Sequence, residues 1–162
     1  MIITVTKGIG YGKTLLSSFD AALNTAGVAN YNIIPLSSII PVGSEIKIAK
    51  YKTQENEFGH RLYVVKAEKR SDHAGKAVGA GIGWYQLEDG SGLFVEHEIE
   101  GQSMRIVDAV LKTDITNSLI DLCKTRNIQF HPRRLQMQII SAHVKNSPTC
   151  ALVMAVYRAD EW

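Results

Sequence analysis

The sequence has little net charge, few cysteines and no long apolar run. Its 162 residues carry 18 basic and 16 acidic side chains, for a formal net charge of +2. Because the numbers of basic and acidic side chains are nearly equal, the chain has no strong electrostatic preference for nucleic acid or acidic membranes. No apolar run approaches the roughly 20 residues that a membrane-spanning helix needs. We therefore expect a globular protein that binds neither nucleic acid nor membranes.

The sequence also lacks the cysteine and histidine patterns of a metal site or a disulfide framework. The two cysteines, Cys123 and Cys150, belong to no CxxC or Cys/His pattern, and the five histidines show no ligand or triad spacing. We expect both cysteines to be small core residues and predict no metal site. Residues 1–7 have no basic segment followed by an apolar core, so no signal peptide is predicted and the cytoplasm is the expected location.

The spacing of apolar residues predicts an α+β fold in one domain, residues 1–162. Apolar positions three and four residues apart predict helices over 14–26, stopped by Gly27, and over 103–126. Alternating and β-branched segments predict strands that pair antiparallel and carry the helices on their faces. These strands are 2–6, 33–36, 45–50, 61–68, 76–87, 92–99, 136–143 and 150–157.

Glycines gather in two places. Residues 8–14 read Gly-Ile-Gly-Tyr-Gly-Lys-Thr, which we expect to break the first strand, and the GxxxxGK[ST] spacing of a phosphate loop is not met. In the strand 76–87, glycine at 79, 81 and 83 leaves one face nearly bare. Such a face predicts the close approach of another backbone or of a neighbouring subunit.

Ser37 and Ser38 form the most informative feature, because they lie between apolar residues with Pro35 and Pro41 on either side. In a strained peptide, the Ser38 hydroxyl can attack the carbonyl carbon of Ser37 and replace the amide by an ester. Elimination across the Ser38 side chain would then cut the chain and leave a pyruvoyl group on the new N-terminus. The alternative is that the pair is only a turn.

Glu96 is the best acid for a reaction at such a group. A pyruvoyl ketone condenses with a primary amine and draws electrons from the bond to the adjacent carboxylate, the role that pyridoxal phosphate plays in other enzymes. An acid must then return a proton. Glu96 shares a strand face with Phe94, and a carboxyl beside an aromatic in a partly dry site can hold a proton near neutrality. An exposed strand glutamate is the alternative, and Glu98 and Glu100 compete for the role.

Two further polar residues are candidates. Asp20, at the border of the first helix's apolar stripe, could accept two parallel hydrogen bonds from a guanidinium. Asn32, six residues before Ser38, could orient the Ser37 carbonyl or donate to a developing oxyanion. Each also has an ordinary structural interpretation, as a surface aspartate and as an asparagine that satisfies local backbone groups.

Together these residues resemble the pyruvoyl-dependent arginine decarboxylases. The resemblance covers nearly the whole chain. It is most specific from Phe19 to Pro41, resumes in the segment 92–98 around Glu96, and is looser over the last helix and the strand 150–157.

The resemblance implies a four-layer αββα sandwich with antiparallel sheets. It also implies self-cleavage between Ser37 and Ser38 into a β chain 1–37 and an α chain 38–162, with a pyruvoyl cofactor derived from Ser38. By position, Asn32 would assist the cleavage, Asp20 would contact the substrate guanidinium, and Glu96 would supply the proton. The implied assembly is a homotrimer, sometimes paired into a hexamer, with active sites at subunit interfaces.

The function predicted from this resemblance is decarboxylation of L-arginine to agmatine and carbon dioxide. Two alternatives stay open. Asp20 favours a cationic substrate without distinguishing guanidinium from ammonium, so another amino acid such as histidine or ornithine could be the substrate. If Ser37-Ser38 is only a turn, the protein would be a non-catalytic oligomeric binding module.

Overall fold

The computed structural model describes all of residues 1–162, which form two helices, a short 3₁₀ turn and nine strands. The helices are α1 (Leu15–Ala26) and α2 (Met104–Thr125), and the 3₁₀ turn is Pro132–Arg134. The strands are β1 (Ile2–Tyr11), β2 (Asn32–Pro35), β3 (Ile39–Ile40), β4 (Glu45–Ile48), β5 (Arg61–Ser71), β6 (Ala77–Gln86), β7 (Gly92–Gly101), β8 (Leu135–His143) and β9 (Thr149–Asp160).

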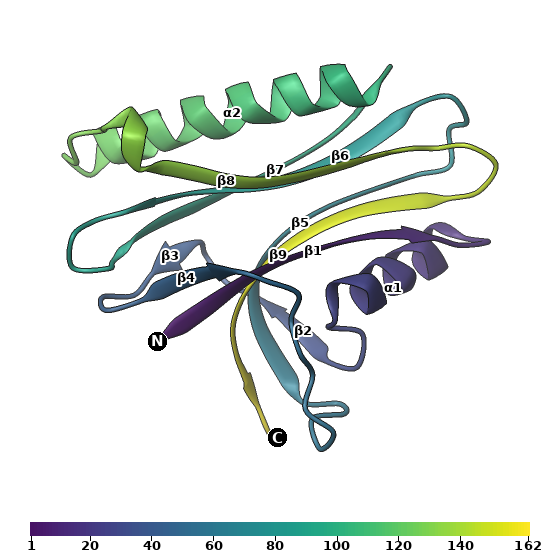
Figure 1. Cartoon of the computed structure of the whole chain (residues 1–162), viewed down its shortest axis with the longest axis horizontal. Coiled ribbons are helices and arrows are strands. Elements are labelled where there is room, and N and C mark those ends of the chain that lie inside the picture. The colour runs from purple at the N-terminus through teal and green to yellow at the C-terminus, as the bar shows by residue number, and fades with distance from the viewer.

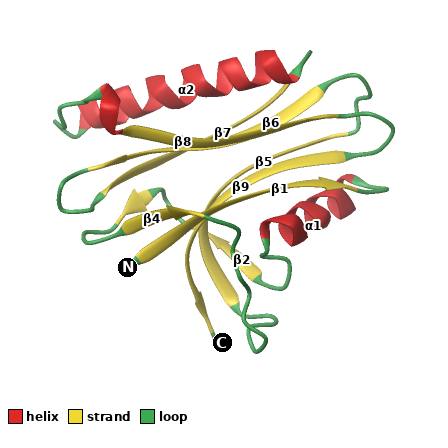
Figure 2. Cartoon of the chain, in the orientation of Figure 1, coloured by secondary structure: helices red, strands yellow, loops and turns green.

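These elements stack in four layers, helix, sheet, sheet and helix (Figure 1). The first sheet has the order β2-β5-β9-β1-β4 and the second has the order β3-β7-β6-β8. Helix α1 covers the outer face of the first sheet and α2 covers the outer face of the second, as the colouring by secondary structure makes plain (Figure 2). The predicted α+β sandwich is confirmed.

The pairing of strands refines the expectation of antiparallel sheets. The central pairs β5–β9, β1–β9, β6–β7 and β6–β8 are antiparallel. At the two edges of the first sheet, however, β1 pairs with β4 and β2 pairs with β5 in parallel. The first sheet is therefore mixed, because β2 and β4 enter it from crossing segments rather than from hairpins.

The main core lies between the two sheets. Val65, Val153 and Ala155 of the first sheet meet Ile82 and Phe94 of the second, and all five are buried. A separate cluster packs α1 onto the other face of the first sheet. Because the sheets bury one face each against the other, side chains that alternate along β7 point either into this core or toward α2.

The prediction that glycines break the first strand is wrong, since β1 continues through Gly8 and Gly10 to Tyr11. A Cβ atom at Gly8 would lie 2.2 Å from the Ala22 carbonyl oxygen, and one at Gly10 would lie 2.1 Å from the Ser18 carbonyl oxygen. The glycines thus let the backbone of α1 lie directly on the strand.

The glycines of β6 also accommodate a helix. A Cβ atom at Gly79 would lie 2.2 Å from Cγ1 of Val107, and one at Gly83 would lie 2.1 Å from Cγ2 of Ile115. The bare face is therefore filled by side chains of α2 within the chain, and not by another backbone or a neighbouring subunit as expected. The buried residues of α2 recur at every fourth position: Val107, Leu111, Ile115, Leu119 and Cys123.

Two further observations complete the fold. Cys123 and Cys150 are buried and free, which confirms their prediction as core residues. Neither helix combines the length and the apolar character needed to cross a lipid bilayer.

Candidate functional site

The serine pair lies where the chain crosses from one sheet to the other. Strand β2 ends in the first sheet at Pro35, and β3 begins in the second sheet at Ile39. The Leu36 N–H donates to the Val64 carbonyl oxygen at 2.8 Å, and the Ser38 carbonyl oxygen accepts from the Phe94 N–H at 2.8 Å. The Ser37–Ser38 peptide is therefore held by a different sheet on each side. The two-residue strand β3 was not predicted.

Ser38 adopts a strained backbone conformation. Its φ angle is +43°, and only one other non-glycine residue, Asn127, has a positive φ. This left-handed region is costly for residues with a Cβ atom, and such strain gathers at functional sites. A residue in a costly backbone conformation thus lies on the downstream side of the predicted bond.

Glu96 on β7 faces Ser38 directly. The Ser38 hydroxyl donates to both carboxylate oxygens of Glu96, at 2.6 Å to Oε1 and 2.8 Å to Oε2. The Glu96 side chain is half-buried and follows Phe94 on the face that turns toward the other sheet. The structure thus brings together Ser38 and Glu96, two residues far apart in the sequence.

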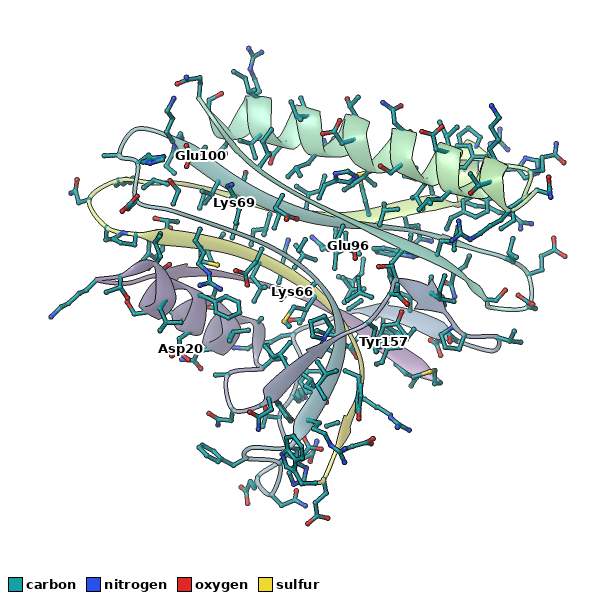
Figure 3. The ribbon with its side chains drawn as sticks, turned by 180° about the vertical axis from the view of Figure 1, so that it is seen from behind. Asp20, Lys66, Lys69, Glu96, Glu100 and Tyr157 are labelled. Atoms are coloured by element: carbon teal, nitrogen blue, oxygen red, sulfur yellow. The ribbon has the colours of Figure 1, made fainter.

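The competing glutamates lie elsewhere. Glu98 is exposed, and Glu100 accepts a hydrogen bond from His73 Nδ1 at 2.9 Å. The Ser71 hydroxyl, with a further contribution from His73, lowers the pKa of Glu100. Figure 3 shows Glu100 well apart from Glu96, and the Ser38 hydroxyl donates to Glu96 rather than to either competitor.

Tyr157 is a member of this site that the sequence did not single out. Its hydroxyl donates to the Ile39 carbonyl oxygen at 2.9 Å, and its ring meets the ring of Phe94 edge-on with centroids 6.2 Å apart. Burial, with a smaller contribution from the Glu96 charge, raises the pKa of Tyr157. The hydroxyl therefore remains a proton donor to the backbone beside Ser38. Sequence showed only an aromatic residue at the end of an apolar strand, which does not reveal a contact with a residue 118 positions away.

A pocket of about 360 Å³ opens beside Ser38. It reaches from the crossing segment along β7 to the C-terminal half of α2. Its lining residues are Ser38, Phe94, Val95, Glu96, His97, Ser118, Asp121 and Leu122. The Nε2 atom of His97 lies 2.8 Å from the Ser118 hydroxyl, which ties the helix to the strand across the pocket.

The other two predicted site residues do not lie at this pocket. Asp20 is exposed on α1, in the outer layer behind the first sheet, and Figure 3 shows it well apart from Glu96 and Tyr157. Asn32 is exposed at the start of β2, where its side-chain amide donates to the Gly59 carbonyl oxygen at 2.6 Å. Within one chain, neither residue contacts Ser37 or Ser38.

The residues present fit a pyruvoyl group at position 38. Such a group would be the N-terminal residue of a cut chain, so it needs a scissile bond rather than a separate binding cavity. The strained Ser38, the carboxylate within hydrogen-bond distance of its side-chain oxygen, and the pocket beside both supply the bond, an acid–base group and space for a substrate. No cluster of three or more His, Cys, Asp or Glu side chains suited to a metal ion is found.

Comparison with known proteins agrees with this geometry. The family described as pyruvoyl-dependent arginine decarboxylase matches residues 2–161. A protein of that name from Thermoplasma volcanium is 24% identical over 162 residues, which cover 99% of this chain and 89% of the relative. Another from Picrophilus torridus is 34% identical over 100 residues, 60% of this chain and 55% of the relative. A third, from Halobacterium salinarum, is 32% identical over 108 residues, 67% of each chain.

Proposed function

The chain belongs to the pyruvoyl-dependent arginine decarboxylase family, and from this premise we propose that it cuts itself between Ser37 and Ser38 and then converts L-arginine to agmatine and carbon dioxide. The observation that carries this proposal is the pair of hydrogen bonds from the Ser38 hydroxyl to Glu96 at a residue with positive φ. The three relatives bear the same name and support arginine as the substrate.

The self-cleavage begins at the Ser38 side chain. Its Oγ attacks the carbonyl carbon of Ser37, the peptide C–N bond breaks, and an ester with a free amine at residue 38 results. Loss of the Cα proton and of the Ser37 carboxylate then cuts the chain into 1–37 and 38–162. Water replaces the amine nitrogen, which leaves as ammonia, and a ketone remains at position 38. Every atom of the new group thus comes from Ser38 and water.

Two contacts favour this sequence of steps. The hydrogen bond from the Phe94 N–H to the Ser38 carbonyl oxygen and that from Tyr157 to the Ile39 carbonyl oxygen hold the backbone on the downstream side of the bond. The positive φ of Ser38 means that cleavage relieves strain. A reaction within a fixed loop also avoids the entropic cost of bringing the reacting groups together.

The chain's residues then serve the decarboxylation. The pyruvoyl group supplies an electron sink that takes up the substrate's α-amine and accepts the electrons released with carbon dioxide. Glu96, half-buried beside Phe94 and next to position 38, donates the proton to the substrate carbon that loses the carboxylate. Phe94, Val95 and Leu122 are the apolar residues that line the pocket beside that carbon.

Asp20 and Asn32 can take the roles that the family resemblance gives them only from a second copy of the chain. Both are exposed, on α1 and at the start of β2. The proposed assembly is therefore a homotrimer or hexamer in which α1 of one copy approaches the Ser38 site of the next. Asp20 would then contact the substrate guanidinium, and Asn32 would assist the self-cleavage.

Two measurements test the proposal. Intact mass and denaturing electrophoresis of the purified protein should show two fragments, the larger one blocked to Edman sequencing. Carbon dioxide release should then be much faster with arginine than with ornithine, lysine or histidine. A single full-length chain without turnover of any amino acid would contradict the proposal, and a cut chain that prefers another amino acid would change only the substrate.

A further inference from the structure

The residue before Asp20 on α1 is held by two cations of β5. The guanidinium of Arg70 lies 4.1 Å from the centroid of the Phe19 ring, and the Lys66 ammonium lies 5.5 Å from it. Both cations also pair with Glu68, which lies between them on the same face of the strand, 2.6 Å from Arg70 Nη2 and 2.8 Å from Lys66 Nζ. We call these four side chains the Phe19 clamp.

The Phe19 clamp is partly shielded from water, unlike an ordinary surface ion pair. The side chains of Lys66, Glu68 and Arg70 are only 24%, 18% and 29% exposed. The Phe19 ring packs against the buried cluster beneath α1, and Nε of Arg70 is buried without a hydrogen-bond partner. Arg70 is thus held by the ring and by Glu68, and partial burial makes both interactions stronger than they would be in open solvent.

The clamp fixes one side of α1, and the glycines of β1 fix the other. Gly8 and Gly10 let the backbone of α1 lie directly on β1, whereas Phe19 meets β5. Since β1 and β5 lie on either side of β9, the helix is held at two places across its width. Asp20 projects about 5–6 Å from the helix axis, so a rotation of about 10° would move its carboxylate by about 1 Å.

Glu68 also affects the charge that Asp20 presents. Lys66 and Arg70 both contact the residue next to Asp20, and an unpaired cation there would compete for the Asp20 carboxylate. Each of the two is instead paired with Glu68, and none of the ion pairs in the chain involves Asp20. The clamp therefore holds the turn that carries Asp20 without neutralising it.

We propose that Arg70 is a positioning residue for substrate recognition. Through Phe19 and Glu68 it sets the rotation of α1, so that Asp20 meets the substrate guanidinium in a neighbouring copy. This inference rests on the proposed function, and within it on the role of Asp20. It adds a residue that acts through α1 and lies on a different element from the carboxylate it positions.

The first test compares Arg70→Met with Lys69→Met. Arg70→Met keeps an unbranched side chain beside Phe19 and removes the cation, so we expect the KM for arginine to rise about threefold to tenfold. The kcat should stay within about twofold, because the proton donor is untouched. Lys69→Met is the matched control, since Lys69 is the neighbouring cation on the opposite face of β5, and it should leave both constants within about twofold. Arg70→Lys, which keeps a cation over the ring, should restore most of the lost affinity.

A double-mutant cycle with Asp20→Asn separates positioning from a general loosening of the fold. If Arg70 acts through Asp20, the Asp20→Asn/Arg70→Met variant should have the KM of Asp20→Asn alone, because an absent carboxylate cannot be misplaced. Phe19→Leu removes the ring and leaves Arg70, so it should behave like Arg70→Met in the same cycle and replaces that variant if Arg70→Met does not fold. Electrophoresis and analytical ultracentrifugation should show every variant cut and assembled as the wild type is.

The outcomes distinguish this inference from the proposed function. A raised KM in Asp20→Asn beside a wild-type KM in Arg70→Met, or effects that multiply in the double variant, would overturn the inference and leave the proposed function standing. An unchanged KM in Asp20→Asn would also overturn it, since Arg70 would then have no carboxylate to position. An uncut wild type without turnover of any amino acid would reject the proposed function and the inference with it.

Discussion

The crossing segment and helix α1 each carry predicted site residues, yet only the first forms a site within one chain. At the crossing, Ser38 and Glu96 meet at 2.6 Å and Tyr157 holds the next peptide at 2.9 Å. On α1, Asp20 faces solvent in the outer layer. The difference teaches that the fold of a single chain brings Ser38 and Glu96 together, whereas the role proposed for Asp20 would depend on assembly.

Ser38→Ala should have the largest effect, because it removes the atom that starts the chemistry of the crossing segment. The chain should stay uncut and show no decarboxylation, while its fold and assembly persist. Electrophoresis and a carbon dioxide release assay measure this. Ser37→Ala is the matched control, since it keeps the attacking hydroxyl, and we expect it to be cut. Processing of Ser38→Ala would mean that the scissile bond is misassigned.

Glu96→Gln should come next and should separate the two reactions of the site. The amide oxygen can still accept the Ser38 hydroxyl, so the chain should be cut. Without the carboxylic acid, we expect kcat to fall about 10²-fold to 10⁴-fold. Timed assays of carbon dioxide release on fully cut protein measure kcat. Glu98→Gln is the control, because Glu98 is exposed and lies two residues further along β7. A near-normal kcat would remove Glu96 as the proton donor.

Tyr157→Phe should have an intermediate effect that shows how firmly the crossing segment must be held. It removes only the hydrogen bond to the Ile39 carbonyl oxygen and leaves the ring contact with Phe94. We expect self-cleavage to slow about fivefold, the value of one neutral hydrogen bond of roughly 1 kcal/mol. The fraction of cut chain over time after synthesis measures this. Tyr63→Phe is the control, because Tyr63 also packs against the core between the sheets. This variant should be cut at the wild-type rate.

Asp20→Asn should have the smallest effect on a single chain and tests the other side of the comparison. If α1 of a neighbouring copy completes the site, the KM for arginine should rise about tenfold in the assembled protein, with kcat nearly unchanged. Analytical ultracentrifugation beside the kinetic assay would show whether the assembly is retained. No change in KM at a concentration where the oligomer is intact would remove Asp20 from the site.

Much of this architecture was readable from local pattern. The 3.6-residue period predicted both helices, and the alternation of apolar residues predicted most strands. Ser38 and Glu96, which the expected chemistry had linked, lie within hydrogen-bond distance of each other. The family predicted from these residues is confirmed. These features depend on nearby residues or on chemistry specific to a few side chains, which a sequence displays directly.

What could not be read depends on tertiary contacts. Gly8 and Gly10 look like strand breakers until the backbone of α1 is placed on them. The contact of Tyr157 with Ile39 joins two sheets, which neither strand reveals by itself. Asp20 is likewise far from the site because α1 and the site lie in different layers of the sandwich. Periodicity along one helix does not reveal which layer the helix occupies.

The order of strands in the first sheet would have a consequence for a protein cut between Ser37 and Ser38. Residues 1–37 contain β1, α1 and β2, and β1 lies between β9 and β4 while β2 pairs with β5. All three flanking strands belong to residues 38–162, so a severed piece 1–37 would stay bound by strand hydrogen bonds, β1 along both of its sides and β2 along one. Once denatured, however, the two peptides must find each other in dilute solution, which no intact precursor has to do. Folding would then have to precede cleavage, and refolding of the cut protein would be a bimolecular reaction that depends on protein concentration.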